Sequence, residues 1–185
     1  MAELIRNPQI MKKAQNEVRS VVKNKGKVEE TDIQHLHYFK MILKETLRLY
    51  PPGPLLIPNE AKRGFKVDEY DIQPKTRIVI NAWAIGREAT YWEKPEEFFP
   101  ERFINNSIDT KGQDFQLIPF GSGRRMCSGM NMGMAFMEIA LANLLYAFNW
   151  DLIQGMSKED IDLEEFKGST LKKKNPLILM ASRHT

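Results

Sequence analysis

Hydrophobic positions in the first fifty residues recur at helical spacing. Asn7-Pro8 places a favoured N-cap residue before a proline at the first helical position, and the apolar residues that follow predict a helix ending near Gly26. A second helix is predicted over residues 36–50, where Pro51-Pro52-Gly53-Pro54 ends it because proline cannot continue a helix. The residues before Asn7 fit the end of a preceding helix. Residues 1–50 are therefore expected to be helical.

The pattern changes to short extended runs after these prolines. Gly64 and Gln73-Pro74-Lys75 separate the runs, so a small sheet is predicted within residues 54–83. Residues 84–129 follow as an irregular segment, or meander, rich in aromatic residues, prolines and charges. Within it, Ser107 to Gln113 has the polar composition of a flexible loop.

The most apolar stretch of the chain lies in residues 130–150. Glu138 and several polar residues interrupt it, and a charge near the middle of a membrane-spanning helix is costly. A long buried core helix is therefore predicted, with no transmembrane segment. Residues 151–185 are expected to hold the C-terminal strands, including Leu177 to Met180.

Composition narrows the class of protein. A chain of 185 residues with 42% hydrophobic residues is enough for one domain, and the helices outweigh the strands. A single cysteine excludes an internal disulfide framework and a zinc site built from several cysteines. The net charge of +3 is too small to indicate nucleic-acid binding, because the one basic run, Lys172 to Lys174, is typical of a solvated turn.

The only cysteine, Cys127, carries the strongest chemical signal. It lies in the run Phe120-Gly121-Ser122-Gly123-Arg124-Arg125-Met126-Cys127-Ser128-Gly129, just before the long apolar helix. A helix N-terminus and nearby cations stabilise a thiolate, which can act as a metal ligand or as a nucleophile. A nucleophile needs a histidine base, and His35, His37 and His184 have no catalytic signature around them. A buried packing role needs neither the glycines nor the arginines.

The pattern Phe120-x-x-Gly123-x-Arg125-x-Cys127-x-Gly129 resembles the haem-thiolate loop of the cytochrome P450 family. The resemblance implies the C-terminal part of that fold, mainly α with a small β-sheet and incomplete. It implies haem b (iron protoporphyrin) as the cofactor, Cys127 as the axial ligand of its iron, and Arg125 as the partner of a haem propionate. In the family, the thiolate favours O–O bond cleavage.

Two further segments resemble the family and imply a structural network. Glu45 and Arg48 lie three residues apart on one helix face, within a segment similar to the family's Glu-x-x-Arg helix. Pro100-Glu101-Arg102-Phe103 is similar to the segment that supplies a second arginine. The resemblance implies a buried network of Glu45, Arg48 and Arg102 behind the haem loop, in which the planar guanidinium groups bind the carboxylate.

Residues after the proline run correspond to a family segment on the substrate side of the haem. Leu55, Leu56 and Ile57 are apolar there, which favours a lipophilic substrate or, equally, an ordinary sheet core. Two positions depart from the family pattern. Asn59 stands where an arginine often reaches a propionate, and Ser128 stands where many plant members have proline, which is expected to alter the stiffness of the loop.

The resemblance covers residues 1–180 and only the C-terminal part of the family, with microsomal plant members most similar. It implies monooxygenation of a lipophilic small molecule with O2, using electrons from an NADPH-dependent flavoprotein reductase. For full-length members it also implies the cytosolic face of the endoplasmic reticulum membrane, with the anchor absent from this chain. Two alternatives stay open: a haem-binding or inert partial domain, and isomerase or dehydratase chemistry on the same fold. The resemblance implies no nucleic-acid partner.

Overall fold

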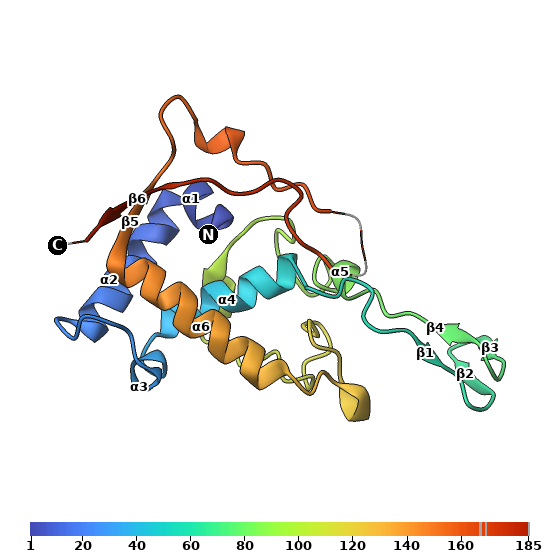
Figure 1. The fold of residues 1–185 in the computed structure, drawn as a ribbon. Coiled ribbons are helices and arrows are strands. Elements are labelled where there is room, and N and C mark those ends of the chain that lie inside the picture. The colour runs from blue at the N-terminus through green and yellow to red at the C-terminus, as the bar shows by residue number, and fades with distance from the viewer. Residues whose placement is uncertain (167, 169, 185) are drawn as a thin grey trace.

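The computed structural model describes residues 1–166, 168 and 170–184, and most of its helices gather at one side while two antiparallel strand pairs project from the other (Figure 1). The predicted fold class, mainly α with little β structure, is confirmed. The α-helices are α1 (Ala2–Arg6), α2 (Pro8–Val22), α3 (Glu30–Ile33), α4 (His37–Leu49), α5 (Ala82–Ile85) and α6 (Met130–Ala147). The strands are β1 (Asn59–Glu60), β2 (Phe65–Val67), β3 (Tyr70–Ile72), β4 (Arg77–Ile78), β5 (Phe148–Asp151) and β6 (Met180–Arg183), and the 3-10 helices are η1 (Pro100–Phe103), η2 (Gly123–Arg125) and η3 (Lys158–Asp160).

The two predicted N-terminal helices are α2 and α4. Pro8 occupies the first turn of α2, as expected, although α2 ends at Val22 and not at Gly26. The helix α4 stops at Leu49, immediately before the prolines. Its first turn is capped from α2, because the Glu17 carboxylate accepts 2.8 Å hydrogen bonds from the first two N–H groups after His37.

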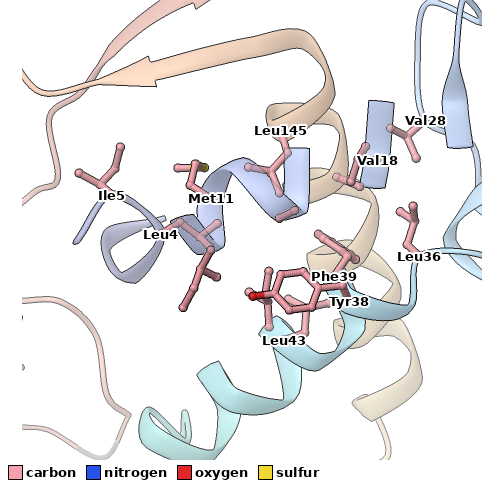
Figure 2. Close-up of a cluster of buried hydrophobic side chains, with 14 of the residues drawn as sticks. Leu4, Ile5, Met11, Val18, Val28, Leu36, Tyr38, Phe39, Leu43 and Leu145 are labelled. Atoms are coloured by element: carbon pink, nitrogen blue, oxygen red, sulfur yellow. The ribbon is translucent and has the colours of Figure 1, made fainter. Parts of the chain in front are cut away.

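One apolar core holds these helices together. Figure 2 shows side chains of α1, α2, α4 and α6 converging on a common interior. Val18, Phe39 and Leu145 are fully buried there, although they come from three different helices. Burial of a side chain of this size contributes about 1.5–3 kcal/mol. The core therefore fixes α6, and with it the segment that precedes α6, relative to α4.

The β structure predicted in residues 54–83 is present, but it does not form one sheet. β1 pairs only with β4 and β2 only with β3, so the region forms two separate two-stranded antiparallel units. Leu55 to Ile57 form no strand, because the Leu56 N–H donates to the Gly53 carbonyl at 3.1 Å and Leu56 adopts a positive φ of 49°. The run that starts at Arg77 leaves the strand after Ile78 and enters α5.

The prediction of a long buried helix in residues 130–150 is wrong in burial and in its end point. The helix α6 stops at Ala147, and Phe148 already belongs to β5. Only Met130, Ala142 and Leu145 are buried, while Met132 and Phe136 are each 64% exposed. The near-uniform apolarity of α6 could not reveal which of its faces α2 and α4 cover. Among the described residues, no helix has the length and apolar character needed to cross a membrane.

The C-terminal strands are fewer and later than predicted. β5 pairs with β6 in antiparallel register, from Phe148 opposite Arg183 to Asp151 opposite Met180. Leu177 to Met180 was expected as a strand, but β6 begins only at Met180. Within the described part of residues 152–179, β pairing is limited to the isolated bridge between Glu165 and Lys173.

Candidate functional site

Cys127 is held in a turn that depends on glycine. Its N–H donates to the Phe120 carbonyl at 2.9 Å, and its own carbonyl accepts the N–H of Met130, the first residue of α6, at 3.4 Å. Gly121 and Gly123 have φ values of 76° and 69°, a conformation that side chains oppose. The turn therefore folds back on itself and delivers Cys127 to the start of α6.

The surroundings of the thiol are open. Cys127 is exposed, and so are Arg124 and Arg125. A Cβ built on Gly129 would lie 3.9 Å from Cys127 Sγ, whereas one built on Gly123 would meet nothing within 4 Å. In the described part of the chain, neither arginine forms an ion pair. The geometry presents one thiol and free guanidinium groups to an incoming ligand.

Glu45, Arg48 and Arg102 lie together in a buried ion cluster. Arg48 binds the Glu45 carboxylate with two nitrogens, Nε to Oε2 and Nη2 to Oε1, each at 2.8 Å. Arg102 Nε shares both carboxylate oxygens at 3.0 and 3.1 Å. The side chains of Glu45 and Arg48 are fully buried, and that of Arg102 is 7% exposed. The carboxylate is therefore surrounded by donors and has almost no access to water.

The cluster holds two positive charges and one negative charge, and backbone carbonyls accept the remaining donors. Arg48 Nη1 donates to the carbonyls of Gly86 and Pro95 at 2.6 Å each, and its Nη2 donates to that of Glu97 at 3.1 Å. Arg102 donates to the carbonyls of Glu93, Lys94 and Glu97 at 2.7 to 3.3 Å. The cluster therefore fixes the course of the meander over α4.

Three contributors to this cluster carried no recognised signal in the sequence. The backbone N–H of Phe99 donates to Glu45 Oε1 at 2.8 Å. Trp92 is buried, with the guanidinium carbons of Arg48 and Arg102 at 5.4 and 6.0 Å from its ring centroid. Gly86 is so close to α4 that an added Cβ would lie 2.4 Å from the Arg48 carbonyl oxygen. Backbone hydrogen bonds and close backbone contacts of this kind produce no pattern of residue types in the sequence, so the sequence could not predict them.

One residue of the apolar segment after the proline run, Leu56, lies near the cysteine turn. A Cβ built on Gly121 would lie 3.9 Å from Leu56 Cδ1. Its neighbours Leu55 and Ile57 are 50% and 86% exposed, so they do not form a sheet core in this chain. None of the three residues lies in a strand of this structure. Asn59 lies in β1, and its side chain donates to the Ile57 carbonyl at 3.3 Å.

His35 and His37 lie on the surface of the N-terminal half of the chain. Both are exposed, His35 in the short connection between α3 and α4 and His37 at the first residue of α4. Among residues 1–166, 168 and 170–184, no group of three or more histidine, cysteine, aspartate or glutamate side chains could hold a metal ion.

Comparison with known proteins places the whole arrangement in one family. The family model "Cytochrome P450" matches residues 1–180. The chain is 59% identical over 184 residues to cytochrome P450 71A1 of Persea americana, and 52% identical over 184 residues to cytochrome P450 71B9 of Arabidopsis thaliana. It is also 52% identical over 182 residues to strychnine-11-hydroxylase of Strychnos nux-vomica. These alignments cover 98–100% of the chain but only 36–37% of each relative.

Proposed function

The chain belongs to the cytochrome P450 family, and we propose that it carries the haem-thiolate part of a monooxygenase that inserts one oxygen atom from O2 into a lipophilic small molecule. Family members bind haem b. The observation that carries the proposal is the exposed Cys127 thiol, held by a glycine-dependent turn at the start of α6. The name of the Strychnos relative records a hydroxylase, which is one form of this chemistry.

The residues around the thiol fit a large flat cofactor. Gly123 and Gly129 leave the space beside the turn free of side chains, so that a ring system can approach the sulfur closely. We assign Cys127 as the ligand of the haem iron and Arg125, which is exposed and has no ion-pair partner among the described residues, as the partner of a propionate. Bound haem supplies the activation of O2. Phe120 contributes its carbonyl, which fixes the Cys127 amide.

The buried cluster of Glu45, Arg48 and Arg102 has a structural role in this proposal. It anchors the meander that leads into the cysteine turn, and because Glu45 and Arg48 are fully buried and Arg102 is only 7% exposed, the cluster is poorly placed to meet a substrate. Leu55, Leu56 and Ile57 contribute apolar surface next to the turn, which favours a lipophilic substrate. The rest of the pocket would come from parts of the family fold that lie outside the matched 37%.

We also propose the partner and location that the family implies. Electrons would come from an NADPH-dependent flavoprotein reductase, and the exposed Arg124, which has no ion-pair partner among the described residues, suits an acidic docking surface. The full-length protein would act at the cytosolic face of the endoplasmic reticulum membrane. Unchanged reduction kinetics over a wide range of salt concentration would contradict the electrostatic docking.

Haem titration tests the assignment of Cys127. The chain is titrated with haem, reduced and exposed to carbon monoxide, and the difference spectrum reports whether a thiolate binds the iron. We expect a thiolate spectrum that Cys127→Ala abolishes and that Ser128→Ala, at the neighbouring exposed position, retains. A thiolate-type spectrum that persists in Cys127→Ala would refute the assignment. Thiolate binding without turnover by the chain and its reductase would favour the haem-binding partial domain.

A further inference from the structure

We propose that Gly112 and Ser122 position the Cys127 turn, and that residues 108–114 act as a strap that supports the thiol from behind. Most of the strap lies in Ser107 to Gln113, which is predicted to be a flexible polar loop, yet Thr110 is only 5% exposed and Gly112 is buried. The role of the strap in haem binding rests on the function proposed above.

Gly112 fits against the turn with no room for a side chain. Its φ is 74°, and a Cβ built on it would lie 2.9 Å from the Gly121 carbonyl oxygen, 3.1 Å from Met126 Sδ and 3.1 Å from Ser122 Cα. Two of these three neighbours are backbone atoms, which cannot rotate away as the end of a flexible side chain can. Only glycine combines this backbone conformation with this approach.

A side-chain hydrogen bond joins the same two segments. Ser122 Oγ donates to the Gly112 carbonyl at 2.5 Å. The donor lies between Gly121 and Gly123, both of which have positive φ. Glycines lose more conformational freedom on folding than other residues, so a turn built on them has weak preference for one shape. The contact with Gly112 supplies that preference.

Hydrogen bonds brace the strap and tie both of its ends. Within it, the Asp109 N–H donates to Asp114 Oδ2 at 2.8 Å, and at its C-terminal end the Asp114 carbonyl accepts the N–H of Leu117 at 2.8 Å. At its N-terminal end, Lys44 Nζ donates to the Ile108 carbonyl at 2.6 Å. Lys44 precedes Glu45 on α4, so the strap connects the helix that holds the buried cluster with the turn that holds the thiol.

Amide hydrogen exchange in the haem-free chain tests the contact. The reporters are the N–H of Cys127, bonded to Phe120, and the N–H of Gly121, bonded to Ile118. In Ser122→Ala we expect both to exchange about fivefold faster, the factor that corresponds to one hydrogen bond of about 1 kcal/mol. In Gly112→Ala we expect a larger increase, about tenfold or more, because the clash adds to the lost contact.

Matched controls separate the loss of the contact at Gly112 from the cost of placing alanine at a positive φ. Gly26 has a φ of 83° and nothing within 4 Å of an added Cβ, so Gly26→Ala has the same unfavourable φ without the clash. We expect it to leave Cys127 exchange unchanged. Ser122→Thr keeps the hydroxyl and should restore protection that Ser122→Ala loses. If Gly112→Ala fails to fold, the two Ser122 variants decide the question.

The proposal fails if Cys127 exchanges equally fast in Ser122→Ala and Ser122→Thr, or equally fast in a folded Gly112→Ala and in Gly26→Ala. Haem titration adds a second measurement, the thiolate share of the reduced carbon monoxide spectrum, which a change in overall stability alone would not alter while the chain stays folded. At a temperature where all variants are folded, the thiolate share of the reduced carbon monoxide spectrum should fall in Ser122→Ala and recover in Ser122→Thr. A parent chain with no thiolate spectrum would refute the proposed function, whereas the exchange data would still test the strap.

Discussion

Removal of the Glu45 carboxylate should cost about 3–5 kcal/mol of the free energy of unfolding, which is the usual cost of breaking a buried ion pair. In Glu45→Ala, Arg48 Nε loses its acceptor while the side chain stays fully buried, and Arg102 Nε loses its acceptor while 7% exposed. The Phe99 N–H also loses its 2.8 Å partner. Two unneutralised guanidinium groups then remain in the cluster, with only backbone carbonyls to bind them.

Urea denaturation followed by circular dichroism measures this loss. The matched control is Glu164→Ala, which removes a 2.6 Å ion pair with Lys174 whose side chains are 63% and 55% exposed. Exposed pairs of this kind contribute below about 1 kcal/mol. Glu45→Gln, which keeps one acceptor oxygen, should fall between the two. Equal losses in Glu45→Ala and Glu164→Ala, with unchanged denaturant slopes, would refute the claim that the buried cluster holds the meander on α4.

Two further outcomes follow from single positions. Gly86→Ala should destabilise the chain by about 1–3 kcal/mol, because the added Cβ would lie 2.4 Å from the Arg48 carbonyl oxygen. Gly133→Ala inside α6, where an added Cβ would meet nothing within 4 Å, should instead stabilise the chain by about 0.5–1 kcal/mol. Thermal denaturation that shows a change of the same sign for both variants would contradict this. Partial burial raises the pKa of Glu138, and Lys40 opposes this only in part. Glu138→Gln should therefore increase the free energy of unfolding at about pH 7, and the gain should vanish below about pH 4, where the carboxyl is protonated in both states. Urea titrations at the two pH values check this, and an equal gain at both would exclude the titration of Glu138 as the cause.

The sequence itself determined the two main helices of the first half and the family of the chain. Prolines at 8 and 51 fixed where α2 begins and where α4 must end, because the proline ring acts on the local backbone whatever the tertiary context. The run around Cys127 and the two arginine segments indicated the family, because their side-chain types and spacing match its pattern.

Only the tertiary structure decided which surfaces meet. The apolar sequence of α6 predicted burial, but the faces that α2 and α4 leave uncovered stay exposed at Met132 and Phe136. The polar strap predicted mobility, but Gly112 packs against the Cys127 turn. Local propensity acts on neighbours along the chain, whereas burial and close backbone approach depend on segments that are distant in sequence. The sequence therefore determined which residues carry the chemistry of the proposed site, and the packing of the chain decided what holds them in place.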